Sequence, residues 1–387
     1  MESRNHSLTV INSTILSADL KLMNDTETER ELRKVDFNVQ WMGKDVFWAF
    51  TELTEHYGSL PLEDRIVLLL KGIQPIYFAF LAIIAVPGNL LTILILSRGK
   101  CGLSKCVTLY LVAMAAADLI VVIFDLILRH IPMVYWRQFH FPWPVPVCNI
   151  HAVILYAATD CSVWFTVSFT FDRFVAICCQ KLKSTYCTER TVAVVLGTVT
   201  VLNCLKDLFW YFMLTGEYNL LSDPWICWER GGVVGSTLWA TIEFTHYFLT
   251  PVAPFFLILL FNTLTVKQIL TASRARNRLR GQSSGEKPRD AEMESRRKPI
   301  ILLFAVSGNF IVLWAVFMIH SIWNRLWWLG FRSIVPPNFV QKMGFILQHL
   351  SCCTNTALYA VTQRKFREQL KSVFIYPVTL IVTFKKR

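Results

Sequence analysis

The segment IQPIYFAFLAIIAVPGNLLTILILS, residues 73–97, contains no Asp, Glu, Lys or Arg and is apolar along most of its length. A helix needs roughly 20 such residues to cross a bilayer core of about 30 Å, so this segment is long enough to span a membrane. The whole chain has the same character, because 54% of its 387 residues are hydrophobic and only 17% are charged. The segment therefore predicts an integral membrane protein.

Six further segments are similarly long and apolar. With the first, they predict seven membrane-spanning helices, over about residues 73–97, 106–129, 147–179, 191–214, 240–270, 298–324 and 338–361. The last of these is the most polar. We expect an all-α, seven-transmembrane helix bundle over residues 73–361, preceded by residues 1–72 and followed by residues 362–387. Because the number of spans is odd, the two ends of the chain lie on opposite sides of the membrane.

The Lys and Arg residues between the predicted helices orient the bundle. Three, three, ten and seven of them lie in residues 98–105, 178–190, 267–298 and the tail from residue 364, whereas the opposite connections hold only two, one and two. Cytoplasmic connections carry the positive excess, so we expect an extracellular N-terminus, with the first helix directing insertion. This sorting also accounts for the net charge of +12, and nucleic-acid binding is not predicted.

Three N-glycosylation sequons lie in the polar N-terminal segment, at Asn5, Asn12 and Asn24. A polar tail often contains one such tripeptide by chance, but three within 26 residues agree with the orientation derived from the charges. We therefore predict a glycosylated extracellular segment over residues 1–72 and a multi-pass protein of the plasma membrane.

Most of the eleven cysteines lie within helices or near the cytoplasmic side, where thiols stay reduced. Only Cys148 and Cys227 fall in extracellular connections, so we predict a disulfide between them. Cys148 precedes Arg173 by 25 residues, which is about 37 Å of helix and slightly more than the hydrocarbon thickness. Arg173 is therefore expected at the cytoplasmic end of the third helix.

Short motifs follow one another through the predicted helices. In chain order they are PGNLL with Asn89, LVAMAAADL with Asp118, Asp172-Arg173-Phe174, Pro254, LWAV with Trp314, and NTALY with Asn355 and Tyr359. This ordered set resembles the rhodopsin-like (class A) G-protein-coupled receptors over residues 73 to about 374. The basic segment QRKFREQL, residues 363–370, resembles the short amphipathic eighth helix of that family.

The resemblance implies a receptor that transmits the binding of an extracellular small-molecule or peptide ligand to a heterotrimeric G protein. His246, eight residues before Pro254, the stretch RLRG at 278–281 and AAADL further resemble an orphan branch associated with aromatic amino acids and short peptides. Two alternatives remain: a seven-helix transporter or channel, and a receptor-fold protein that no longer signals. No Walker loop, HExxH motif, paired zinc-spaced CxxC or nucleophile elbow is present, so no enzyme is predicted.

The family assigns a signalling switch to Asp172 and Arg173, with Asn355 and Tyr359 on one face of the seventh helix as a relay. The alternative is an interfacial arginine that reaches the lipid headgroups. The family's kinking prolines are replaced by Val316 and Thr356. Arg296 stands where some members carry an acid, so we expect no acidic lock on Arg173 from the sixth helix.

Asp118 is a carboxylate in an apolar helix and needs polar partners, water or a cation. The resemblance implies that it forms a polar pocket with Ser162, Asn355 and Asn89, in which an allosteric sodium ion is a candidate. Ala158 stands where many members carry an Asn ligand, which weakens the case for sodium. The alternative is an unpaired structural carboxylate.

A ligand pocket is expected on the extracellular side of the bundle. Leu155 replaces the aspartate of amine receptors, which disfavours a biogenic-amine ligand. His349 replaces the lysine of opsins, which excludes an opsin. Glu243 and His246, at i and i+3, are a candidate polar pair. The alternatives are that the aromatic residues pack the core and that His246 is a neutral interhelical histidine. The candidate pocket residues are Tyr156, Thr159, Glu243, His246, Tyr247, Trp314, Phe317, Met318 and Phe345.

Overall fold

The structure is a computed structural model that describes residues 61–134, 146–219, 227–231, 236–280, 291–328 and 337–373. The chain divides into two units, Met1–Arg65 and Ile66–Arg387, and the helix bundle belongs to the second. The predicted glycosylation sites and the end of the C-terminal tail lie outside the described residues.

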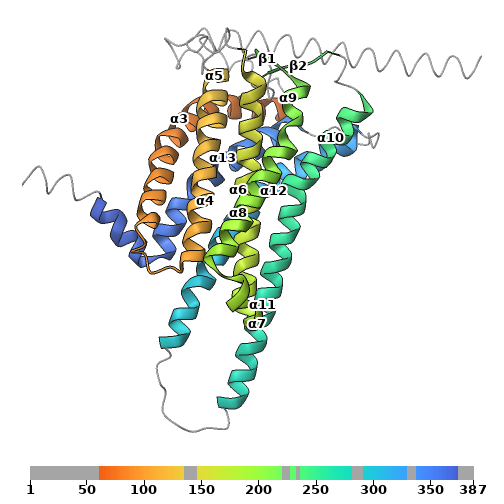
Figure 1. The fold of residues 1–387 in the computed structure, drawn as a ribbon. Coiled ribbons are helices and arrows are strands. Elements are labelled where there is room, and N and C mark those ends of the chain that lie inside the picture. Colours follow the sequence, from red (N-terminus) through yellow and green to blue (C-terminus); the bar gives the residue numbers. More distant parts are fainter. Residues whose placement is uncertain are drawn as a thin grey trace, which may run out of the picture. The chain divides into compact units, whose positions relative to one another are not determined.

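Long helices account for most of the described chain (Figure 1). In chain order they are α3 (Leu62–Ser97), α4 (Lys105–Val121), the π-helical η1 (Val122–His130), α5 (Ile131–Val134), α6 (Cys148–Cys178), α7 (Gln180–Tyr186), α8 (Glu189–Asp207), α9 (Phe209–Met213), α10 (Thr237–Tyr247), the π-helical η2 (Phe248–Val252), α11 (Ala253–Arg280), α12 (Ala291–Trp328) and α13 (Asn338–Thr362). Joined end to end where they are continuous, these elements form seven rods at the positions of the seven predicted spans. The all-α membrane class is confirmed.

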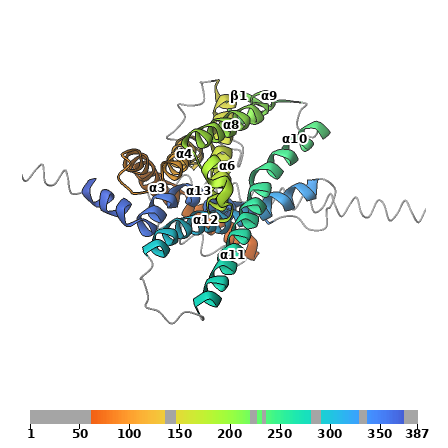
Figure 2. The ribbon, with the colours of Figure 1, turned by 60° about the horizontal axis from the view of Figure 1, so that its bottom comes forward.

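The third rod, α6, forms the centre of the bundle. It packs against α4, α8, α11 and α12, and Figure 2 shows it among these helices. Accordingly, α6 buries polar as well as apolar side chains, whereas α8 leaves much of its surface exposed. A buried polar side chain needs a partner, so α6 is where interhelical polar contacts are expected.

Six described helical stretches are long and apolar enough to cross a membrane: Leu62–Ser97, Lys105–Met133, Cys148–Cys178, Glu189–Met213, Thr237–Ala275 and Pro299–Leu326. The seventh rod, α13, is not among them, which agrees with its prediction as the most polar span. Its buried polar residues include Gln348, His349 and Asn355, and it packs extensively against α12. These polar side chains lower the mean hydropathy of α13. The membrane tolerates them because they face the inside of the bundle rather than lipid.

A two-stranded antiparallel hairpin follows α9. Its strands are β1 (Leu214–Tyr218) and β2 (Cys227–Glu229), with Leu214 opposite Glu229 and Tyr218 opposite Cys227. A Cβ atom on Gly216 would come within 2.6 Å of the carbonyl oxygen of Pro146, so only glycine allows this close approach. The hairpin thus packs at the start of α6. The sequence analysis did not predict it.

Several predicted helix boundaries differ from the structure. The first rod begins at Leu62 rather than at residue 73, and the fifth ends at Arg280 rather than at residue 270. The second rod does not end at residue 129 but continues through η1 and α5 to Val134. The fifth rod is interrupted at η2, where Thr250 has non-helical φ and ψ angles of −149° and 111°. The sixth extends beyond residues 298–324, to Ala291 and Trp328. Residues 364–373 are helical after a break at Gln363.

Candidate functional site

One end of the bundle is held by a disulfide and is called the disulfide end below. Cys148, the first residue of α6, is bonded to Cys227, the first residue of β2, with the two Cα atoms 5.7 Å apart. Both cysteines are buried, in a cluster with Ala152, Trp210 and Leu214. The covalent bond therefore fixes the hairpin to α6.

Asp118 lies in the middle of the bundle with polar partners on two other helices. The Ser162 hydroxyl donates to Oδ1 of Asp118 at 2.5 Å, and Nδ2 of Asn355 donates to Oδ2 at 2.6 Å. Asn89 instead donates to the backbone carbonyl of Cys352 at 3.0 Å. The structure thus brings Asp118, Ser162 and Asn355 into direct contact and attaches Asn89 to the neighbouring backbone of α13. A small cavity lies beside Ser162 and Asn355 and is also lined by Trp314.

These residues fit a sodium ion only in part. Asp118 and Ser162 offer the oxygen atoms that a hard cation prefers. However, each carboxylate oxygen of Asp118 already accepts a hydrogen bond, and Ala158 adds no oxygen. The side chains around Asp118 therefore satisfy its charge by hydrogen bonding.

The opposite end of the bundle contains the Asp172-Arg173 pair and is called the Arg173 end. Nε of Arg173 donates to Oδ2 of Asp172 at 3.0 Å, and Nη2 of Arg173 contacts the same oxygen. Both side chains are buried, which argues against an arginine that reaches the lipid headgroups. Among the described residues, Oδ1 of Asp172 has no hydrogen-bond partner.

Tyr359 is separate from this ion pair. Its ring packs edge-on against Phe366 with the centroids 6.0 Å apart, in a cluster with Tyr110 and Phe169. Within the described chain its hydroxyl has no hydrogen-bond partner, so the structure does not connect it to Arg173. Arg296 belongs to α12, at positions whose side chains the structure does not describe.

Four of the predicted pocket residues form one aromatic chain across three rods. The Phe317 ring lies 5.9 Å from Trp314, 5.4 Å from Phe345 and 6.4 Å from Tyr247, measured between ring centroids. Nε1 of Trp314 also donates to the Ser351 hydroxyl at 3.3 Å. The chain connects α10, α12 and α13 immediately beside the cavity near Asp118.

The other predicted pocket residues take different roles. Tyr156 stacks on Trp210, with 4.4 Å between the ring centroids. The Thr159 hydroxyl donates to the Leu155 carbonyl on its own helix, and Thr159 lines the small cavity. Met318 is buried on α12. The structure therefore brings these residues into the same half of the bundle but not into one cavity.

The predicted Glu243–His246 pair does not form. Glu243 instead forms an ion pair with Arg325 of α12, whose guanidinium also lies 4.5 Å from the centre of the Tyr247 ring. His246 faces α6 and α8, and its Nδ1 lies 3.1 Å from Nζ of Lys206. A full opposite charge on the neighbouring helix attracts Glu243 more strongly than a neutral imidazole on its own helix does.

Comparison with known proteins agrees with this geometry. The sequence profile of the family described as 7 transmembrane receptor (rhodopsin family) matches residues 88–359. The chain belongs to this family. It is therefore a multi-pass membrane receptor of the G-protein-coupled class, and the family is not one of enzymes.

Individual relatives are distant but cover most of the receptor. It is 25% identical to the human growth hormone secretagogue receptor type 1 over 339 residues, which are 84% of this chain and 86% of that protein. It is 22% identical to the FMRFamide receptor of Drosophila melanogaster, over 95% of this chain and 63% of that protein. It is 24% identical to the N-arachidonyl glycine receptor of Rattus norvegicus, over 82% and 87%.

The sequence analysis missed two buried ionic clusters of the receptor. In the first, Nζ of Lys206 forms ion pairs with Asp160 and with Asp207, whose Oδ1 is 3.0 Å away, and contacts His246. In the second, Arg129 donates to Asp125 at 2.7 Å, and two histidines lie beside them. Asp118 is therefore not the only carboxylate buried between the described helices.

A signal for both clusters was present in the sequence. Asp125 and Asp160 are carboxylates inside apolar segments, and the reasoning applied to Asp118 applies equally to them. They were passed over because they do not occupy positions of a family motif. Their partners lie on other helices and could not be identified from spacing along the chain.

Proposed function

We propose that this receptor binds an extracellular peptide or small molecule at the disulfide end of the bundle and activates a heterotrimeric G protein at the Arg173 end. The proposal rests on what the two ends of α6 contact. Its first residue is fixed by a disulfide, and its other end holds a buried arginine whose described hydrogen bonds go to the neighbouring aspartate. One continuous helix therefore links the two ends.

Contacts within the bundle lead from the aromatic residues toward Asp118 in its middle. The aromatic chain of Tyr247, Phe317 and Trp314 connects the fifth and sixth rods and borders the cavity beside Asn355. A ligand that prefers one packing of these rings would shift an equilibrium between two arrangements of the rods. That shift would reach Asp118 through its hydrogen bond to Asn355.

The chemistry near the disulfide end favours a ligand with polar groups. Arg325, near the end of α12, and Glu243, on α10, provide a cation and an anion that form an ion pair with each other. One relative is named for FMRFamide, a peptide, and another for N-arachidonyl glycine, an acyl amino acid. A third is named for growth hormone secretagogues. We propose a peptide or an amino-acid derivative for this receptor.

The membrane orientation belongs to the same proposal. The basic connections at the Arg173 end support a cytoplasmic position for that end, and the three sequons support an extracellular N-terminal segment in the plasma membrane. The helical residues 364–373 follow α13 and bury Phe366, which supports an eighth helix along the cytoplasmic surface. The allosteric sodium ion remains a minor proposal, because the side chains fit it only in part.

The test is a ligand screen with a matched signalling-dead variant. Cells expressing the receptor are exposed to amino-acid derivatives and short peptides, and activation of each G-protein class is recorded. We expect at least one compound to activate the wild type but not Arg173→Ala at equal surface expression. A compound that binds but activates no G-protein class would support a receptor fold that no longer signals. Ion flux that persists in Arg173→Ala would support a transporter instead.

A further inference from the structure

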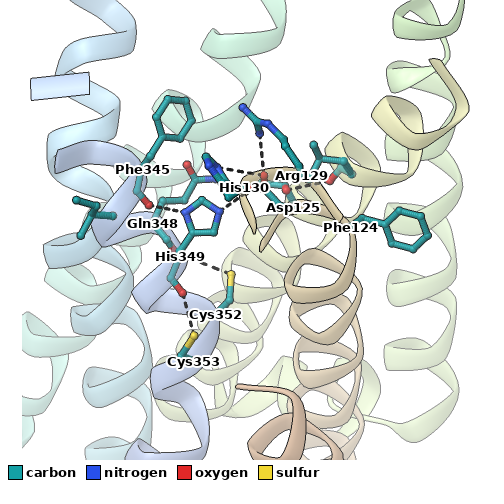
Figure 3. A network of polar contacts seen from close by, with 12 residues as sticks. Phe124, Asp125, Arg129, His130, Phe345, Gln348, His349, Cys352 and Cys353 are labelled. Carbon is teal, nitrogen blue, oxygen red and sulfur yellow. Dashed lines mark hydrogen bonds and ion pairs between the residues drawn. The ribbon is translucent and has the colours of Figure 1, made fainter. Parts of the chain in front are cut away.

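Three side chains that can bind a metal ion meet between η1 and α13, near the disulfide end (Figure 3). They are Asp125 and His130 from η1 and His349 from α13. All three are buried, and one ligand atom from each lies within 4.8 Å of the others. His151, one turn after Cys148 on α6, shows how near the cluster lies to the disulfide end. Its Nε2 lies 2.7 Å from the carbonyl oxygen of Phe124, the residue before Asp125.

The π-helical geometry of η1 places two of the three side chains on the same side. Hydrogen bonds in a π-helix run between residues five apart, so such residues lie above one another. Asp125 and His130 are five apart, and Nε2 of His130 lies 3.5 Å from Oδ1 of Asp125. π-Helical turns are rare and often occur at functional sites. The widened turn is therefore what assembles the η1 side of the cluster.

His349 makes contacts that require a cation beside one of its nitrogen atoms. Its Nδ1 lies 2.6 Å from the carbonyl oxygen of Phe345, which can only accept, so Nδ1 carries a hydrogen. Its Nε2 lies 3.0 Å from Oδ2 of Asp125, a carboxylate already paired with Arg129. A neutral imidazole has no second hydrogen. For both contacts to be favourable, a positively charged species, either a proton or a metal ion, must lie between Nε2 of His349 and Oδ2 of Asp125.

We propose that Asp125, His130 and His349 form a binding site for a divalent transition-metal ion, and that Zn²⁺ is the ion that fits it best. Zinc binds imidazole nitrogen and carboxylate oxygen at about 2.0–2.2 Å, which places neighbouring ligand atoms about 3.3 Å apart in a tetrahedral site. Nε2 of His349 lies 3.0 Å from Oδ2 of Asp125, and Nε2 of His130 lies 3.5 Å from the other carboxylate oxygen, Oδ1, so both separations are close to that value. Two histidines and one carboxylate leave a fourth position for water or an exchangeable ligand.

The surroundings of the cluster resemble those of known metal ligands. A metal-binding histidine usually donates its other ring hydrogen to a carbonyl or carboxylate, as Nδ1 of His349 does to Phe345. A metal-binding carboxylate is usually held by a further hydrogen bond, as Asp125 is by Arg129. The Phe78 ring packs against both histidine rings, with centroids 4.7 Å and 5.5 Å away, and covers them with apolar surface.

A second buried cluster has the same kinds of side chain, but a lysine ammonium group occupies its centre. Asp160, Asp207 and His246 could also hold a metal ion, but Nζ of Lys206 contacts all three. That ammonium group stands where a metal ion would be. In the cluster of Figure 3 the cation is the guanidinium of Arg129, which bonds Oδ1 of Asp125, whereas His349 faces Oδ2.

Arg129 sets the expected strength of binding. Its charge cancels that of Asp125, so a divalent ion adds two uncompensated positive charges to a buried site. We therefore expect moderate affinity in the wild type and tighter binding when Arg129 is made neutral. Bound zinc would join η1 to α13 and stabilise the arrangement of helices that keeps Asp125 and His349 together. This site does not depend on which ligand or G protein the receptor uses.

The test measures thermal unfolding of the full-length receptor in lipid nanodiscs during titration with zinc chloride, together with competition against a fluorescent zinc indicator. We expect zinc to raise the Tm of the wild type, because it binds the folded state. His130→Gln and His349→Gln should each raise the half-saturating zinc concentration by at least about tenfold. Magnesium should have no effect, because it demands oxygen ligands in an octahedron.

Three further variants separate a ligand role from a structural one. His349→Cys keeps a zinc ligand and should retain zinc stabilisation even if His349→Gln folds poorly. Arg129→Gln should lower the half-saturating zinc concentration. His151→Gln removes a buried histidine outside the cluster and should behave like the wild type.

Several results would overturn the proposal. The first is that zinc does not raise the Tm of the wild type. The second is that zinc still raises the Tm of both His130→Gln and His349→Gln. The third is that His246→Gln abolishes the effect of zinc whereas His349→Gln does not. Stabilisation by acid that zinc cannot reproduce would also overturn it, because the species between His349 and Asp125 would then be a proton.

Discussion

Arg173 has few restraints for a residue on which signalling is proposed to depend. In the described part of the chain, the hydrogen bonds of its side chain go to Asp172 alone. The Tyr359 hydroxyl has no partner there, and the residue expected nearest on the sixth helix, Arg296, is itself basic. The resting position of Arg173 therefore depends on one neighbouring carboxylate.

The variant Asp172→Asn tests this dependence. The amide keeps the shape of Asp172 but removes the negative charge, so Arg173 is free to extend more often, and ligand-independent activity should rise several-fold. The measurement is basal G-protein activation in cells at matched surface expression. Lys105→Met, which breaks the exposed ion pair between Lys105 and Glu189, serves as a charge control and should leave basal activity unchanged. Equal basal activity in Asp172→Asn and the wild type would contradict the restraint.

At the residue scale, the sequence predicted motif residues better than their partners. Asp118 and Asn355 stand in motifs of the family, and the resemblance also grouped Ser162 with them; the structure brings all three into contact. Asp125 and Asp160 were equally visible as charges in apolar segments, but their partners come from other rods. Which cation reaches a buried carboxylate depends on helix rotation and on local geometry such as the π-helical turn η1, and neither can be read from one sequence.

At the scale of elements, the Lys206 cluster holds α6, α8 and α10 together. Replacing Lys206 with Met would leave Asp160 and Asp207 facing each other in the interior without a cation. Because breaking a buried ion pair leaves an uncompensated charge, we expect a loss of about 3–5 kcal/mol in stability, measured as a lower Tm in nanodiscs. Adding Asp160→Asn to Lys206→Met should recover part of that loss. A Lys206→Met receptor with unchanged Tm would show that the cluster is not stabilising.

A second prediction at this scale concerns the missing proline of the seventh rod. α13 is continuous through Thr356, whose hydroxyl lies 2.9 Å from the hydroxyl of Thr92 on α3. The residue that replaces proline therefore forms a hydrogen bond between two helices. In a double-mutant cycle of Thr92→Ala and Thr356→Ala, we expect a coupling energy of about 0.5–1.5 kcal/mol in thermal unfolding.

The control for this cycle is Thr362→Ala. The Thr362 hydroxyl donates to Leu358 of its own helix, so it should show no coupling to Thr92. Independent effects of the Thr92 and Thr356 substitutions would mean that the hydroxyl contact contributes nothing.

The helices themselves were the most predictable elements. Length and apolar composition decide whether a segment can cross a bilayer, and both are properties of a continuous stretch of sequence. The π-helical segments and the hairpin were not predicted, because they depend on contacts between segments. Gly216 illustrates this, since its need to be glycine comes from the carbonyl of Pro146, which is 70 residues earlier in the chain.

At the scale of the whole molecule, the disulfide connects residues that are 79 positions apart. Replacing Cys148 and Cys227 with Ser should lower stability by about 2–5 kcal/mol, because the cross-link restricts the unfolded chain. The measurement is the Tm of the purified receptor, with surface expression as a second readout. Cys204→Ser, at an exposed free cysteine, is the matched control. An unchanged Tm in the double variant would exclude a stabilising role for the bond.

We propose that the receptor as a whole transmits a change at the disulfide end to a G protein through Arg173. Its most direct test is nucleotide exchange on purified heterotrimeric G proteins of each class, catalysed by the receptor in nanodiscs. We expect exchange on at least one class without ligand, faster exchange with Asp172→Asn, and none with Arg173→Ala. Exchange that Arg173→Ala leaves intact, or no exchange on any class from either the wild type or Asp172→Asn, would contradict it.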